Sequence, residues 1–217
     1  MFKVMGLIRR RGDLPPDAFR LHWRTIHRGL ALRIAEAGLL AGYVQNHKLD
    51  IPVDGLEIVA DGVPELWFAD AEAFAALRSH AAFRDGAFHD EPNFMDISDY
   101  RSQPLTEEIG TGAPRRECVG LLKAILFLHE GEPGLPGHGA VRTARQTRPA
   151  TPLPIKVAPY VAVETSWWHD LATFRRAWAD HDGPARGLLA EERVVFWPGD
   201  PSPPADWRPV PPTRAQA

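Results

Sequence analysis

The order of hydrophobic patterns along residues 2–101 is the feature that most restricts the fold of this chain. Stretches of alternating apolar and polar residues, typical of half-buried strands, are interrupted by stretches with the 3.6-residue period of helices. The predicted strands are residues 2–9, 40–49, 65–69 and 95–101. One predicted helix begins near Pro15, where Pro15 and Pro16 suit a helix start, and a second covers 71–82. Residues 83–93 are predicted to be irregular.

This order of strand, helix, two strands, helix and strand is that of a ferredoxin-like split βαβ unit. In such a unit two helices cover one face of a four-stranded antiparallel sheet and leave the other face bare. A second sheet packed against the bare face would close a barrel or sandwich. Gly6, on the first strand, is expected to let another group approach the backbone closely.

A weaker copy of the same unit follows a linker predicted over residues 104–117. Residues 118–129, 157–164 and 193–197 are predicted strands and 171–180 a helix, whereas 130–154 is rich in Gly, Pro and Arg and has no helical period. Phe174 and His181 repeat the positions of Phe74 and His80.

We therefore expect an α+β fold of two ferredoxin-like βαββαβ halves whose antiparallel sheets pack into an α/β barrel. The first half is residues 1–106, and the second is residues 116–200, a degenerate copy that lacks the first helix. Residues 201–217 form a Pro-rich tail that is expected to be extended and anchored by Trp207.

Composition restricts the partners and the compartment. The net charge is -3 and the sequence pI about 6.3, which argues against a nucleic-acid partner. Cys118, as the one cysteine, excludes an intramolecular disulfide and fits a reducing compartment. No apolar run approaches the roughly 20 residues of a membrane span, and the first six residues lack a signal-peptide core. We expect a cytoplasmic protein with neither a nucleic-acid nor a membrane partner.

The first predicted helix carries two histidines, His22 and His27. At about 100° per residue they lie about 140° apart, at opposite borders of an apolar stripe that includes Ile26. Two ring nitrogens so far apart do not suit one metal ion, so no metal site is expected. Arg20, Arg24 and Arg28 lie on the opposite, solvated face of the wheel.

His27 is the first candidate for a catalytic residue. A histidine beside a cavity can act as a general acid or base near neutral pH. His22 has the same two readings, catalytic or structural, and only one of the pair is expected to face a cavity. The alternative for both is a hydrogen-bonded helix histidine with no catalytic role.

Several residues could bind a substrate. Trp23 and Trp67 could form the walls of a pocket for an aromatic ligand, although core packing is the commoner role for Trp23. Tyr43, Asn46 and His47 offer a phenol, an amide and an imidazole that could orient a carbonyl or phenolate. Tyr43 and Asn46 point to opposite faces of an ideal strand, so at most one of them should face a cavity unless a bulge intervenes.

The chain also resembles a known family, over about residues 2–103. The resemblance rests on Arg9-Arg10-Arg11-Gly12, Ala18-Phe19, His22-Trp23, His27 and the strand Gly42-Tyr43-Val44-Gln45-Asn46-His47. Together these are similar to the EthD domain of the dimeric α/β-barrel superfamily. The resemblance implies an association with oxidoreductases of degradation pathways. Because some barrels of this superfamily hold haem through a histidine near a strand tryptophan, His80 or His89 with Trp67 is a minor haem alternative.

We therefore expect an enzyme that acts on an aromatic or polyketide-like compound by proton transfer, with no cofactor. Isomerisation, cyclisation, dehydration and cofactor-free oxidation all remain open. The alternative is a non-catalytic protein that binds a hydrophobic ligand or accompanies an oxygenase, and a haem-binding oxidoreductase is a minor one. The expected partner is a small hydrophobic or aromatic ligand, and a homodimer of the fused chain is a further expectation.

Overall fold

The computed structural model describes residues 1–106, 109–150 and 156–206 as an α+β fold on one curled sheet. The strands follow the order β5-β1-β4-β2-β10-β7-β9-β8-β6, and β3 pairs with β10 beside this path. The expected fold class, with ferredoxin-like topology and mostly antiparallel pairing, is confirmed. Within the described residues, no helix has the length and apolar character of a membrane span.

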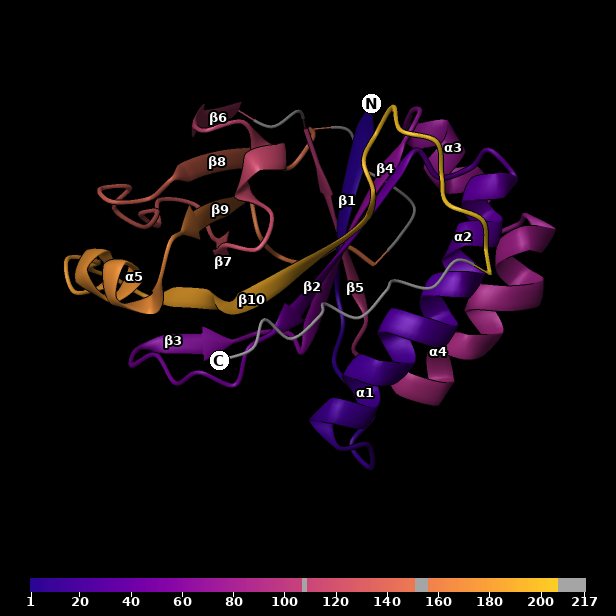
Figure 1. Cartoon of the computed structure of the whole chain (residues 1–217), viewed down its shortest axis with the longest axis horizontal. Coiled ribbons are helices and arrows are strands. Elements are labelled where there is room, and N and C mark those ends of the chain that lie inside the picture. Colours follow the sequence, from indigo (N-terminus) through magenta and orange to yellow (C-terminus); the bar gives the residue numbers. More distant parts are fainter. Residues whose placement is uncertain (107–108, 151–155, 207–217) are drawn as a thin grey trace, which may run out of the picture.

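The first half carries four strands with all of its helices on one side (Figure 1). The strands are β1 (Phe2–Leu7), β2 (Gly42–Lys48), β4 (Gly62–Phe68) and β5 (Arg101–Leu105). Between β1 and β2 lie α1 (Pro16–His22), the π-helical turn η1 (Trp23–His27) and α2 (Arg28–Glu36). Between β4 and β5 lie α3 (Ala71–Leu77), the π-helical turn η2 (Phe83–Ala87) and α4 (Phe88–Phe94). The strand order β5-β1-β4-β2 is that of a ferredoxin-like unit.

The second half places its strands in the equivalent order, β10-β7-β9-β8. Its elements are β7 (Leu122–Leu128), β8 (Arg142–Thr147), β9 (Ala162–Trp168), α5 (Leu171–Trp178) and β10 (Ala185–Phe196). Residues 129–141, which join β7 to β8 and are all described, contain no helix. The short strand β6 (Ile109–Gly112) pairs with β8, β3 (Leu56–Ile58) runs parallel to β10, and η3 (Arg115–Cys118) is a 3-10 turn.

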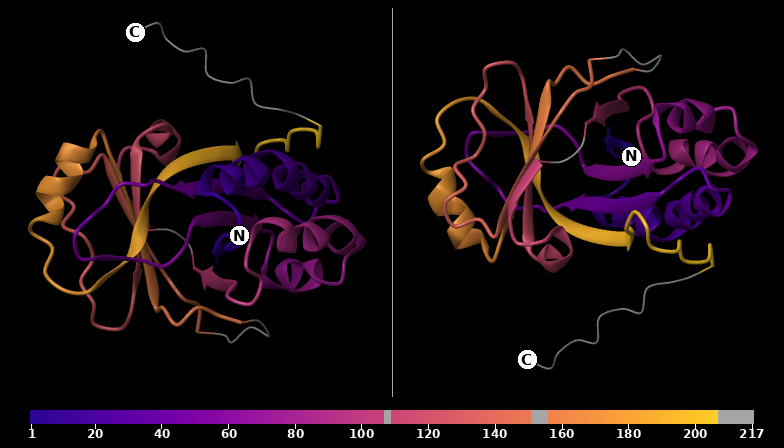
Figure 2. Two further views of the ribbon diagram at one scale, coloured as in Figure 1. Left: turned by 90° about the horizontal axis from the view of Figure 1, so that it is seen from below. Right: turned by 90° about the horizontal axis from the view of Figure 1, so that it is seen from above.

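Strand β10 joins the two halves. Its residues Gly187–Glu191 pair with β7, and its residues from Ala190 to Phe196 pair with β2. Figure 2 shows the result from two sides: the helices of the first half and α5 lie at opposite ends, with the strands between them. Gly187 is required at the crossing because a Cβ there would lie 1.9 Å from the backbone oxygen of Ile125. Gly6 also permits a close approach, because a Cβ there would lie 2.8 Å from the Tyr100 hydroxyl.

Several predicted boundaries are wrong. The fourth strand, expected over 95–101, is β5 at Arg101–Leu105, and 83–93, expected to be irregular, is largely η2 and α4. Pro92 lies inside α4, and such a residue normally argues against a helix. The expected linker over 104–117 contains β6 and most of η3.

The second half also differs from expectation in its boundaries. The strand expected over 157–164 is β9 at Ala162–Trp168, and that expected over 193–197 is the last part of β10. Segment 130–154 contains β8. Of the predicted tail, residues 201–206 are irregular and Ala205 N–H donates to Glu36 Oε1 at 2.9 Å; Trp207 lies outside the described residues.

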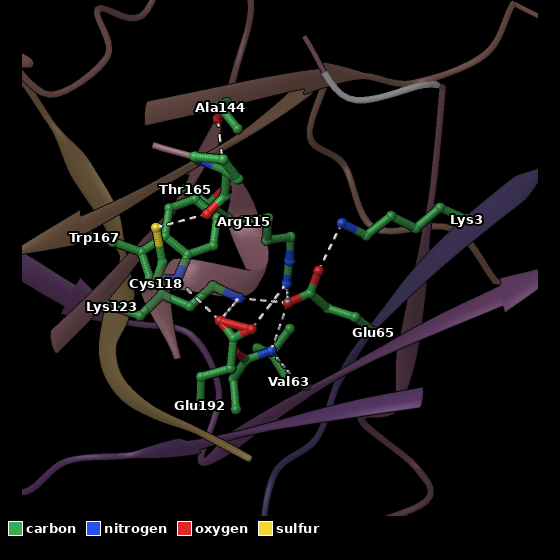
Figure 3. Close-up of polar contacts among 12 residues, drawn as sticks. Lys3, Val63, Glu65, Arg115, Cys118, Lys123, Ala144, Thr165, Trp167 and Glu192 are labelled. Atoms are coloured by element: carbon green, nitrogen blue, oxygen red, sulfur yellow. Dashed lines mark hydrogen bonds and ion pairs between the residues drawn. The ribbon is translucent and has the colours of Figure 1, made fainter. Parts of the chain in front are cut away.

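A buried ionic cluster lies between the two half-sheets, and Figure 3 shows Glu65 of β4 at its centre. Lys3 Nζ of β1 lies 2.6 Å from Glu65 Oε2, and Arg115 Nη2 lies 2.8 Å from Glu65 Oε1. Lys123 of β7 contacts both Glu65 and Glu192 of β10. Burial opposes ionisation, but Arg115, Lys123 and Lys3 hold the pKa of Glu65 well below its usual range. The cluster therefore links strands of both halves through charge.

We predict that Glu65→Gln lowers the free energy of unfolding by about 3–5 kcal/mol, because the substitution leaves buried cations without their shared carboxylate. Chemical denaturation measures this loss. Glu191→Gln is the matched control, since the Glu191 side chain is 50% exposed and pairs with Arg193. A loss no larger than that of the control would show that the cluster does not stabilise the fold.

Candidate active site

The first half encloses a cavity of about 440 Å³ between its sheet and its helices. The walls are mostly apolar and include the rings of Trp23, Phe68, Phe74, Phe83 and Phe88. Polar groups of the lining are His27, Tyr43, Arg78, His89, Glu91, Tyr100, Ser102 and Lys156. An apolar cavity with a few polar groups is the usual form of a small-molecule site.

Asp90 of α4 brings His22 and His27 together. Its Oδ1 lies 2.8 Å from His22 Nε2, and its Oδ2 lies 3.0 Å from His27 Nδ1. Both imidazoles also pack on the Phe94 ring, with centroid distances of 5.2 and 4.7 Å. His27 lines the cavity, whereas His22 is outside the lining. The expected separation of the two histidines on the helix is therefore wrong.

The π-helical turn η1 is the physical reason for this difference. Arg28 N–H donates to Trp23 O, five residues back, so one extra residue is accommodated in the turn. Residues five apart, such as His22 and His27, then lie on the same side of the helix. The same change of phase, about 100° for one residue, exposes Ile26 to 55% and buries Arg28, which is 4% exposed. Ile26 was expected in the apolar stripe and Arg28 on the solvated face.

Asp90 is set up to remain ionised. Burial raises its pKa, but hydrogen bonds with His27, His22 and Asn93 outweigh burial and lower the pKa to about 2. With the Asp90 carboxylate accepting a hydrogen bond from Nδ1–H of His27, the lone pair of the ring lies on Nε2. Nε2 is on the other side of the ring from Asp90. An imidazole held in this way has the tautomer that a general base at Nε2 requires.

Trp23 and Tyr43 both line the cavity and are hydrogen-bonded to each other. Trp23 Nε1 donates to Tyr43 Oη at 3.1 Å, and Gln45 Nε2 donates to the same oxygen at 2.8 Å. Gly62 allows the Trp23 ring to lie against β4, because a Cβ there would be 2.4 Å from Trp23 Cζ3. His47 is the next residue in this series of contacts, and its Nε2 lies 3.1 Å from Gln45 Oε1.

Asn46 and Trp67 lie on the other face of the sheet and outside the cavity lining. Asn46 Nδ2 donates to Glu65 Oε1 at 3.1 Å, within the buried ionic cluster. The Lys3 ammonium and the Arg115 guanidinium lie over the Trp67 ring. Of the five predicted binding residues, Trp23 and Tyr43 therefore line the cavity, and His47 is connected to it through Gln45 and Tyr43.

The histidines of the haem alternative are separated. His89 lines the cavity, whereas His80 is outside the lining and its Nδ1 accepts a hydrogen bond from Ala82 N–H. In the described part of the chain, no group of three or more His, Cys, Asp or Glu residues is arranged to hold a metal ion.

Asp90 and Glu91 are polar residues of the site that the sequence patterns did not single out. Burial raises the pKa of Glu91 to about 7, against a lowering effect of Arg78. Glu91 can therefore be a neutral acid in the cavity near neutral pH. The acidic pair before Pro92 was the only available signal, and it lies in a stretch expected to be irregular.

The raised pKa of Glu91 predicts that the free energy of unfolding depends on pH. Its folded-state pKa of about 7 exceeds the ordinary value of 4.5, so its contribution is present below pH 4.5 and is lost as the pH rises through 7. The loss is at most about 3 kcal/mol. In denaturation curves across this range, Glu91→Gln should flatten the pH dependence relative to the native protein. The exposed Glu72→Gln is the control, and equal pH dependences of Glu91→Gln and the native protein would contradict the assignment.

The chain is similar in fold to solved structures of other proteins. An anthrone oxidase-like protein has a TM-score of 0.52 at 10% identity, over 89% of this chain and 92% of that chain. A candidate chlorite dismutase has a TM-score of 0.45 at 10% identity, over 90% and 94%. A mutant chlorite dismutase from Candidatus Nitrospira defluvii in complex with cyanide has a TM-score of 0.43 at 10% identity, over 87% and 89%. The first likeness shows a shared fold and carries no information on activity.

Sequence comparison finds a match to a known family. No curated protein matches the chain. Residues 11–98 match the EthD domain, a range that includes His22, His27, Tyr43, Asp90 and Glu91. The resemblance expected from the residues is confirmed over this range.

Proposed function

We propose that the protein is an enzyme that binds a small aromatic or polyketide-like molecule in the cavity and transfers a proton with His27. The observation that carries this proposal is the position of His27. Its ring lines the cavity while Nδ1 lies 3.0 Å from the ionised Asp90. A histidine with this second partner is held in one tautomer and one orientation, as a general base requires.

The walls of the cavity favour a flat, apolar ligand. Aromatic side chains contribute from β4, η1, α3 and the η2–α4 segment, and the volume of about 440 Å³ is that of a small-molecule site. The fold shared with an anthrone oxidase-like protein is consistent with such a ligand, but the proposal does not rest on it.

The residues can carry a proton in two directions. Neutral His27 accepts a proton at Nε2, and the adjacent Asp90 carboxylate stabilises the imidazolium that forms. His22 holds the other carboxylate oxygen of Asp90, so it acts as a positioning residue. Glu91, neutral near pH 7, could return a proton to a different atom of the ligand. Isomerisation, cyclisation and dehydration all need this pair of steps.

A haem-binding function is the second candidate, and the same observation supports it. A histidine whose Nδ1 is bonded to a carboxylate is also suited to hold iron through Nε2. His27 would then hold the iron, and Arg78 and Lys156 of the lining would be available to pair with the haem carboxylates. Haem would supply redox chemistry at this site. Titration with haemin should give a Soret band that His27→Ala removes if this candidate is correct, and no band if it is wrong.

Substitution of His27 tests the proton-transfer proposal. Native mass spectrometry of the purified protein against a library of aromatic compounds first identifies a ligand. We expect His27→Ala to lower kcat on that ligand by about 10²–10⁴-fold and to change the dissociation constant little. Asp90→Asn should also lower kcat, because the amide no longer fixes the tautomer. His80→Ala, outside the cavity, is the matched control.

The outcome also separates enzyme from binding protein. If the ligand binds and no turnover is detected in the native protein, the non-catalytic alternative is favoured. If turnover persists unchanged in His27→Ala, the role of His27 is wrong. Self-association of the fused chain as a homodimer is an independent prediction, which sedimentation velocity measures.

A further inference from the structure

We propose that Tyr43 is an obligate hydrogen-bond donor to the ligand, fixed in that role by a relay through Gln45 and His47. The proposed ligand class is a ketone or phenol whose oxygen becomes negatively charged, as an enolate or phenolate. This inference rests on the proposed function, because it places that ligand in the same cavity.

The first step of the argument is the saturation of the Tyr43 oxygen. An indole N–H can only donate, so the 3.1 Å contact of Trp23 Nε1 occupies one lone pair of Tyr43 Oη. The Gln45 amide occupies a second at 2.8 Å. Among the described residues, Tyr43 has no acceptor for its own proton. Because Tyr43 lines the cavity, that proton is available to a bound ligand.

The direction of the hydrogen bond between Gln45 and Tyr43 depends on the orientation of the Gln45 amide. Two contacts fix that orientation. Gln45 Nε2 also lies 3.0 Å from the backbone oxygen of Trp23, which can only accept, so the NH₂ group must be on that side. His47 Nε2 lies 3.1 Å from Gln45 Oε1, and here the imidazole must be the donor. A reversed amide would face acceptor with acceptor at Trp23 and donor with donor at His47.

The protonation state of His47 is consistent with a hydrogen bond donated from His47 to Gln45. The imidazole is 2% exposed and packs on the Trp23 ring at a centroid distance of 4.5 Å. Burial, and then the positive charges of Arg193, Arg24 and Arg20, lower its pKa to about 3, so the ring is neutral. Its single N–H is therefore at Nε2, bonded to Gln45. Donation runs from His47 to Gln45, from Gln45 to Tyr43, and from Tyr43 to the cavity.

A group that donates and cannot accept favours a negatively charged oxygen over a hydroxyl. Burial also raises the pKa of Tyr43 well above its usual range, so the phenol keeps its proton. In the proposed reaction a C–H bond next to a carbonyl breaks, its proton goes to His27 Nε2, and the electron pair moves onto the carbonyl oxygen. Tyr43 stabilises that oxygen, and no oxidant or metal is needed for the step.

The test uses 7-hydroxycoumarin, whose neutral and anionic forms absorb at different wavelengths, with 7-methoxycoumarin as a ligand that cannot ionise. The ionisation constant of the bound dye is measured by absorbance for the full chain and its variants. We expect Tyr43→Phe to decrease this constant by at least about tenfold. His47→Phe should produce a smaller decrease although Tyr43 is present, because the Gln45 oxygen then loses its donor while the Trp23 carbonyl still orients the amide. His47→Gln, which keeps an N–H donor, should restore part of the effect.

Tyr160→Phe is the matched control, because Tyr160 is a buried tyrosine outside the cavity lining. Thermal unfolding of each variant shows whether it is folded, and Tyr43→Phe is conservative enough to test the donor by itself. If both coumarins bind and the ionisation constant of bound 7-hydroxycoumarin is the same in the native protein, Tyr43→Phe and His47→Phe, the relay is wrong and the cavity proposal stands. If neither coumarin binds, the aromatic cavity and the relay are both wrong.

Discussion

The carboxylate of Glu65 is the interaction on which the arrangement of the two halves depends. It is 0% exposed and is shared by Lys3, Lys123 and Arg115, which come from β1, β7 and η3. A buried charge is tolerated only with paired partners, so these segments cannot separate without exposing or orphaning it. The same requirement holds for Glu192 of β10, which contacts Lys123 and accepts a hydrogen bond from Trp167 Nε1.

The ionic cluster and the candidate active site share one wall, strand β4. Glu65 and Trp67 lie on the face of β4 that carries the ionic cluster, whereas Pro64, Leu66 and Phe68 line the cavity. A strand sends alternate side chains to opposite faces, so anchoring one face through charge also fixes the other. This explains why Asn46 and Trp67, although close in sequence to cavity residues, belong to the cluster.

Hydrophobic periodicity was sufficient to predict the fold class, because the positions of the strands and the topology of the sheet both depend on it. The second half was indicated by Phe174 and His181, which repeat the positions of Phe74 and His80. Asp70 and Asp170 each accept the N–H that begins a helix, and both phenylalanines are buried. The site was less predictable, since a helical wheel assumes a constant angle per residue. The extra residue in η1 invalidates that assumption for Ile26 and Arg28, and no composition signal marks it.

One irregular turn connects the two chemical parts of the site. By accommodating an extra residue, η1 places His27 on the same side as His22, so that both reach Asp90. The same turn carries the Trp23 carbonyl that accepts Gln45 Nε2 and thereby orients the amide beneath Tyr43. A regular helix would move the base and the amide acceptor out of register with the sheet by about 100°. The positions of the proposed base and the proposed hydrogen-bond donor therefore both depend on a single local departure from α-helical geometry, which accords with the frequent occurrence of π-helical turns at functional sites.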